Sequence, residues 1–140
     1  MIRLPPELAH RIRGAARAAY PEECCGLLIG HAEGDALVID DVAESVNLSA
    51  RPRDSFEIDM RLRLTLQKAL RGTGREIVGH YHSHPDAPAA PSERDRAQAW
   101  EPDMIWLIAG VADGVAGDLG AFRLDEAAGR FDAVPIVMLA

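Results

Sequence analysis

The sequence predicts one mixed α/β domain of the α+β type, with a curved, mostly antiparallel sheet and helices packed against it. Its 140 residues are 48% hydrophobic and 26% charged, the composition of an ordinary soluble globular domain. The expected elements follow the order α, β, β, β, α, β, α, β, β, β, which is not the regular alternation of a parallel α/β fold. Because no linker-like stretch interrupts this order, residues 1–140 are expected to form a single domain.

The N-terminal part is expected to contain one helix and three strands. The helix begins at Pro5-Pro6 and stops at Tyr20-Pro21, because the residue before a proline disfavours helical geometry. Its apolar face repeats with helical spacing and consists of Leu8, Ile12, Ala15, Ala16 and Ala19. The other expected elements are buried strands over 25–30 and 36–40, a loop over 47–54, and a short alternating strand over 56–58.

The second half is expected to begin with a helix that Asp59 caps and that Gly72 and Gly74 end. The apolar face of this helix consists of Leu62, Leu66, Ala69 and Leu70. The remaining expected elements are a strand over 76–82, a proline-rich loop over 85–91, a helix from Ser92 to about Trp100, and strands over 104–109, 119–124 and 131–138.

Charge and cysteine content narrow the function classes. The 22 acidic residues outnumber the 15 basic ones, so the formal net charge is −7. Such a domain lacks the basic face that binds nucleic acid or anionic membranes, and neither is expected as a partner. No apolar run approaches the roughly 18–20 residues of a transmembrane helix, and charges interrupt any signal-peptide core. The only cysteines, Cys24 and Cys25, are adjacent and poorly placed for a disulfide, so a cytoplasmic location is expected.

The segment with the most chemical information carries two histidines on a predicted strand. Because strand side chains alternate, His82 and His84 point to the same side. Asp95 follows His84 by eleven residues, beyond a loop that can turn the chain back. Two imidazoles and a carboxylate form a three-ligand zinc set, and three protein ligands leave a fourth position open for catalysis. A hydrolase also needs a proton carrier, for which Glu22 and Glu23 are the candidates.

Together these residues resemble the JAMM/MPN+ (Mov34/PAD-1-like) zinc metalloprotease family. The matching stretches, which span nearly the whole chain, are Tyr20-Pro21-Glu22-Glu23-Cys24-Cys25-Gly26-Leu27-Leu28-Ile29-Gly30, His82-Ser83-His84-Pro85 and Ser92-x-x-Asp95. The resemblance implies a cytidine-deaminase-like layout and one Zn²⁺ per chain held by His82, His84 and Asp95. It also implies that Glu23, rather than the adjacent Glu22, is the general acid/base. Ser92 would donate a hydrogen bond to the oxyanion of the tetrahedral intermediate.

The resemblance further implies a metallo(iso)peptidase of the short bacterial type. It would hydrolyse a peptide or isopeptide bond after the C-terminal tail of a ubiquitin-like or small sulfur-carrier protein, with a carrier–cysteine adduct as the preferred substrate. Two alternatives stay open. One is a non-catalytic zinc-binding scaffold or interaction module, and the other is a small-molecule amidase that uses the same zinc site.

Several residues near these motifs have a structural and a functional interpretation. His80 would pack beside the site or serve as a fourth zinc ligand. Cys24 and Cys25 would be small buried hydrophobes, zinc ligands or a nucleophilic thiol. The spacing of Ser92 and Asp95 also fits a helix capping box, which is compatible with catalytic roles.

Two further groups of residues are ambiguous in the same way. A basic cluster would be a solvated surface or a contact for an acidic carrier protein, and it consists of Arg51, Arg53, Arg61 and Arg63. Three aromatic residues are expected in the core or the wall of the site: Tyr81, Trp100 and Trp106.

Overall fold

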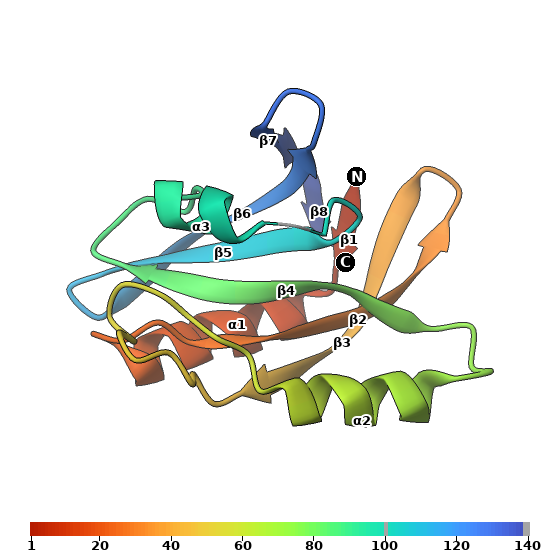
Figure 1. Ribbon diagram of the computed structural model, residues 1–140, viewed down its shortest axis with the longest axis horizontal. Helices are drawn as coiled ribbons and strands as arrows, with labels where there is room; N and C mark the ends of the chain where they lie inside the picture. Colours follow the sequence, from red (N-terminus) through yellow and green to blue (C-terminus); the bar gives the residue numbers. More distant parts are fainter. Residues whose placement is uncertain (100, 139–140) are drawn as a thin grey trace.

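The computed structural model describes residues 1–99 and 101–138, and it is built on one eight-stranded sheet (Figure 1). The strands are β1 (Ile2–Leu4), β2 (Cys25–Glu33), β3 (Ala36–Ser45), β4 (Glu76–Pro85), β5 (Ile105–Ala112), β6 (Val115–Asp125), β7 (Arg130–Val134) and β8 (Ile136–Met138). The described helices are α1 (Pro6–Ala19), α2 (Met60–Leu70) and α3 (Glu93–Gln98). None of them is long and apolar enough to cross a membrane.

The strands follow the order β7-β6-β5-β4-β2-β3-β1-β8. β4 pairs with β5 in parallel, and β1 pairs in parallel with both β3 and β8. The other pairs are antiparallel. The prediction of a mixed fold with a mostly antiparallel sheet is therefore confirmed.

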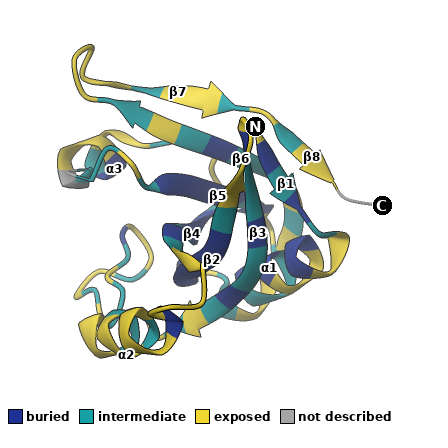
Figure 2. Ribbon diagram, turned by 90° about the vertical axis from the view of Figure 1, so that its right-hand side faces the viewer, coloured by how far each residue is buried: buried dark blue, intermediate teal, exposed yellow. Residues whose placement is uncertain are grey.

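The sheet is curved so strongly that its two edges approach each other. β7 and β8 are separated only by Pro135, yet they occupy opposite ends of the strand order (Figure 2). The Ile2 amide donates to the Pro135 carbonyl at 2.8 Å, which holds β1 at this junction. The prediction of one strand over 131–138 was wrong, because proline has no N–H to continue the ladder and the chain changes partners there.

One short strand was not predicted, and one other predicted strand is not formed. β1 was not predicted because a strand of three residues is too short to show a period. Its buried ends, Ile2 and Leu4, pair with strands that are distant in sequence.

The expected strand over 56–58 is a loop with one isolated bridge between Ile58 and Asn47. There the Asn47 side-chain oxygen accepts from the Glu57 amide at 3.0 Å, so a side chain takes the place of a ladder partner.

α1 supplies the main core on one side of the sheet. Leu8, Ile12 and Ala16 are buried, and the helix contacts β4, β5 and β6. α2 and α3 lie on the other side of the sheet (Figure 2). The helix predicted from Pro5-Pro6 is confirmed, and it leaves the opposite face of β4 free to carry polar side chains.

α2 packs less closely than its sequence pattern predicts. The Asp59 cap is confirmed, since the Asp59 Oδ1 accepts from the Arg61 amide at 2.9 Å. Leu70 is buried, but Ala69 is exposed, so the expected apolar face is only partly used. A cavity of about 80 Å³ lies between α2 and the sheet, lined by residues that include Leu27 and Met60.

α3 is shorter than predicted and ends at Gln98. Its start at Ser92 is confirmed as an N-cap. Trp100, where the helix was expected to end, lies outside the described residues.

The replacement Gly26→Ala is expected to destabilise the fold. Gly26 in β2 pairs with Tyr81 in β4, and a methyl group at Gly26 would overlap the Tyr81 ring. Because both positions are buried, we expect a loss of about 1–3 kcal/mol in the free energy of unfolding, measured by urea denaturation. Gly14→Ala is the control, since the nearest atom to a methyl there is 3.9 Å away in Arg17. It should be neutral or stabilising by up to about 1 kcal/mol; equal stability of the two variants would contradict this packing.

Candidate metal centre

The centre of the site is the row of histidines on β4. β4 lies between β2 and β5, so its backbone is held on both sides. His82 is completely buried and His84 is 6% exposed. Their ring centroids are 4.8 Å apart, and their Nε2 atoms are 3.1 Å apart. The strand alternation predicted from sequence thus brings both imidazoles to one point.

Asp95 reaches the same point from the first turn of α3. Its Oδ2 lies 3.0 Å from the Nε2 of His84 and 3.4 Å from the Nε2 of His82. Ser92 holds this turn in a reciprocal capping box: its hydroxyl accepts from the Asp95 amide at 3.0 Å, and its own amide donates to Asp95 Oδ2 at 2.9 Å. The cap therefore orients the carboxylate toward the histidines.

Glu23 is buried beside this group, whereas Glu22 is exposed. The Glu23 amide donates to the Pro52 carbonyl at 2.7 Å, and its carbonyl accepts from the Asn47 side chain at 3.1 Å. These bonds fix the residue just before β2. Its carboxylate offers a ligand atom that lies within 4.8 Å of those of His82 and His84, and Oε1 is buried without a partner among the described residues. Burial raises the pKa of Glu23 to about 8.

The charges of the group are strongly coupled. Burial opposes ionisation of Asp95, but hydrogen bonds from His82 and His84 lower its pKa well below the usual range. Burial lowers the pKa of His82. For His84 burial acts in the same direction, yet the hydrogen bond to Asp95 prevails and its pKa is raised. The carboxylate is thus charged and surrounded by nitrogen donors.

The side-chain atoms that meet at this point are suitable ligands for a cation. His84 Nδ1 donates to the Pro88 carbonyl at 3.0 Å, so the Nε2 that faces Asp95 has no proton in the neutral ring. Two imidazole nitrogens and a carboxylate oxygen thus meet within 3.0–3.4 Å of one another. Tetrahedral ligands of one zinc ion lie about 3.4 Å apart when each bond is 2.0–2.2 Å, so this spacing fits such an ion.

His80 packs beside the site, two residues from His82. Its ring centroid is 4.4 Å from that of Trp106 and 5.4 Å from that of Phe56. Burial lowers the pKa of His80 to about 3, so the ring is neutral. The packing interpretation of His80 is supported, and Trp106 and Tyr81 are buried as expected.

The two cysteines are free and buried. Burial raises the pKa of Cys24 to about 11 and that of Cys25 to about 12, so neither forms a thiolate near neutral pH. They serve as small buried hydrophobes. Their backbone helps to hold the site strand, since the Cys24 amide donates to the Ser83 hydroxyl at 2.8 Å.

Two residues of the site have no sequence pattern that indicates their role. Phe56 stacks on His82 with ring centroids 4.2 Å apart, and Pro88 orients His84 through its carbonyl. Phe56 was assigned to a strand, although its position between polar residues gave no sign of its partner. A backbone carbonyl carries no sequence signal.

Two clefts flank the histidines. The larger, of about 650 Å³, has Phe56, His80 and Trp106 in its wall, together with α2 residues. The second, of about 540 Å³, includes Glu23, His84 and Ser92 in its wall. The second, polar cleft therefore reaches the site residues, whereas the larger, more apolar cleft reaches His80, two residues from His82.

Comparison with known proteins agrees with this site. Residues 5–125 match the family described as prokaryotic homologs of the JAB domain, Prok-JAB. The chain therefore belongs to this family, and the JAMM-type resemblance found in its motifs is confirmed.

Individual relatives support the same assignment. A desampylase of Haloferax volcanii is 36% identical over 101 residues, which are 72% of this chain and 70% of that protein. The CysO-cysteine peptidase of Mycobacterium tuberculosis is 25% identical over 131 residues, 94% and 88% of the two chains. Among solved structures, protein DSY2949 of Desulfitobacterium hafniense has a TM-score of 0.86 at 31% identity, covering 99% of this chain and 93% of its own.

Proposed function

We propose that the protein is a zinc-dependent peptidase that hydrolyses a peptide or isopeptide bond after the C-terminal tail of a ubiquitin-like or sulfur-carrier protein. The observation that carries the proposal is the convergence of His82 Nε2, His84 Nε2 and Asp95 Oδ2 within 3.4 Å beside the buried carboxylate of Glu23. The named relatives, a desampylase and a CysO-cysteine peptidase, support the substrate class.

In this proposal His82, His84 and Asp95 hold the zinc ion. The ion supplies a Lewis acid that polarises the scissile carbonyl and makes water more acidic. Glu23 accepts a proton from the attacking water and returns it to the leaving amine. The Ser92 hydroxyl accepts from the Asp95 amide, so its own hydrogen remains available to donate to the developing oxyanion.

We expect the carrier protein to bind an apolar surface of this protein beside the larger cleft. An exposed apolar patch, with side chains 49–64% exposed, consists of Val46, Leu48, Met60 and Leu64. The Asp59 amide donates to the Ser45 hydroxyl at 3.0 Å, which keeps the start of α2 next to this loop. Leu48 and Met60 also line this cleft, so the patch continues into it. Grouped exposed apolar residues are typical of a protein-binding surface.

The proposal is tested by incubating the zinc-loaded protein with the CysO-cysteine adduct and with a ubiquitin-like protein joined to a lysine side chain. We expect hydrolysis of at least one adduct, observed by mass spectrometry as the free carrier. Leu64→Asp places a charge in the apolar patch and should lower kcat/KM about 10-fold, because it opposes burial against the carrier.

Thr65→Asp is the matched control for the Leu64 variant. Thr65 is exposed on the same helix, outside the patch, and receives the same charge. Its kcat/KM should stay within about 2-fold of the wild type. Absence of cleavage of both adducts argues against the proposed function, whereas equal loss in the two variants argues against the patch alone.

A further inference from the structure

The position of Glu23 indicates which of the two clefts binds the leaving group. In the proposed reaction Glu23 protonates the leaving amine, so this amine must lie within hydrogen-bond reach of it. Glu23 lines the polar cleft and not the aromatic one. The leaving group therefore enters the polar cleft.

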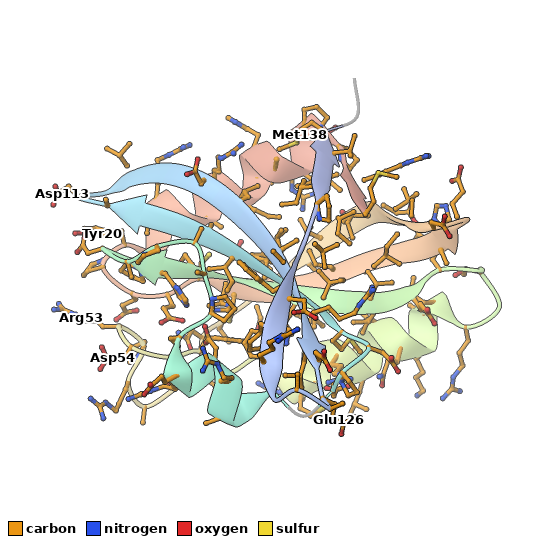
Figure 3. The ribbon with its side chains drawn as sticks, turned by 90° about the horizontal axis from the view of Figure 1, so that it is seen from above. Tyr20, Arg53, Asp54, Asp113, Glu126 and Met138 are labelled. Atoms are coloured by element: carbon orange, nitrogen blue, oxygen red, sulfur yellow. The ribbon has the colours of Figure 1, made fainter. Side chains whose placement is uncertain are left out.

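Two arginines line this polar cleft. Arg53 comes from the loop after β3 and Arg94 from the first turn of α3. Figure 3 shows Arg53 and Asp54 at the tip of that loop, at one end of the molecule. The Glu23–Pro52 hydrogen bond of 2.7 Å fastens the loop to the site, and Arg94 is close enough to Glu23 to act against the rise in its pKa.

These two guanidinium groups differ from those of the other three arginines of the basic cluster, which all form ion pairs. Arg51 pairs with Asp54 at 3.0 Å, Arg61 with Asp59 at 3.0 Å, and Arg63 with Glu101 at 2.7 Å. Arg53 and Arg94 form no ion pair with any of the described residues, 1–99 and 101–138. The wall of the same cleft also carries three acidic residues: Glu23 is buried, Asp54 pairs with Arg51, and Glu93 is exposed, as Arg53 is.

We propose that the polar cleft binds a leaving group with a carboxylate next to its amine, namely a free α-amino acid, and that Arg53 and Arg94 bind this carboxylate. The proposal rests on the proposed function. A guanidinium presents a planar fork of donors that matches a carboxylate, and two of them border the site where the amine must lie. Hydrolysis breaks the amide C–N bond, adds water, and gives the carrier carboxylate and the amino acid.

A lysine isopeptide does not have this feature. Its scissile nitrogen is the ε-amine, separated from its own backbone by four methylenes, and its carboxyl carbon is part of a peptide bond. Such a leaving group gains nothing from two unpaired arginines near the amine. Arg53 and Arg94 thus favour a carrier–amino acid adduct over a carrier–lysine conjugate.

The test compares two substrates that differ by one charge. The CysO carrier is joined through its C-terminal carboxyl to the α-amine of cysteine in one and of cysteinamide in the other. For the wild type we expect kcat/KM to be roughly 10- to 100-fold higher with the free acid, the range for a hydrogen bond to a charged group. In Arg53→Gln and Arg94→Gln this acid-to-amide ratio should fall, and in the double variant it should approach one.

Arg96→Gln is the matched control, since Arg96 is an exposed arginine of the same helix that does not line the cleft. Its ratio should equal that of the wild type. Because the ratio compares two substrates on one protein, a partly unfolded variant does not change it. Equal rates for acid and amide in the wild type, or an unchanged ratio in the double variant, would overturn this inference while leaving peptidase activity intact. Hydrolysis of neither adduct, together with cleavage of the lysine-linked conjugate, would also overturn the inference, whereas cleavage of none of the three substrates would contradict the proposed function.

Discussion

Glu23→Gln is expected to lower hydrolysis at least about 10³-fold while the protein stays folded and keeps its zinc. Glutamine has nearly the same size and can occupy the same buried position, but it cannot carry a proton from water to the leaving amine. General acid–base catalysis contributes about 10²–10⁴-fold, and a 10³-fold loss corresponds to about 4 kcal/mol. Steady-state rates on the cleaved adduct and elemental analysis of the purified variant measure the two quantities.

Glu22→Gln is the matched control, since it makes the same change one residue earlier on an exposed side chain. Its rate should be close to that of the wild type. If Glu23→Gln retains both zinc and full activity, the assignment of the general acid/base is wrong. If the wild type binds zinc and its carrier without cleaving any adduct, the scaffold alternative is favoured.

His82→Ala and Asp95→Ala are each expected to remove most of the bound zinc. Purified wild-type protein should contain close to one zinc ion per chain. Loss of a group that only orients a ligand costs 10–100-fold in metal affinity, so loss of a ligand itself should cost more than about 100-fold. Titration of the metal-free proteins with zinc, followed by calorimetry, measures this change.

The same titration separates two possible ligand sets. Glu23, His82 and His84 also bring donor atoms within 4.8 Å, although Asp95 lies closer to the two imidazoles. If Asp95 is the third ligand, Glu23→Gln keeps its zinc and Asp95→Ala does not. His10→Ala, which removes an exposed histidine of α1, is the control and should bind zinc normally. Zinc retained by Asp95→Ala would contradict the assignment.

Local patterns explain why much of the fold was predictable. The apolar periodicity of α1 and the buried run that begins at Cys25 depend on neighbours in the chain, and both elements formed as expected. β1 and the change of partner at Pro135 depend on pairing between the two ends of the chain. No local pattern encodes that pairing, so these elements could not be found in the sequence.

The candidate site likewise contains residues that local sequence patterns predict and residues that they do not. The spacing of His82 and His84 follows from strand alternation alone, and the Ser92–Asp95 box follows from the start of a helix. Phe56 could not be recognised as the ring that stacks on His82, because 26 positions separate them and the contact depends on how a loop folds back. The sequence shows that Arg53 is charged, but it does not show that Arg53 lines the same cleft as Glu23.

The sequence by itself determined which side chains carry the chemistry and which of them share a strand or a helix turn, since these relations depend only on backbone periodicity. The tertiary structure decided which elements meet. It brought α3 to β4, buried Glu23 and left Glu22 exposed, and placed Arg53 and Arg94 in one cleft. Such contacts arise from packing between distant segments, and burial then sets the charge that each group can hold.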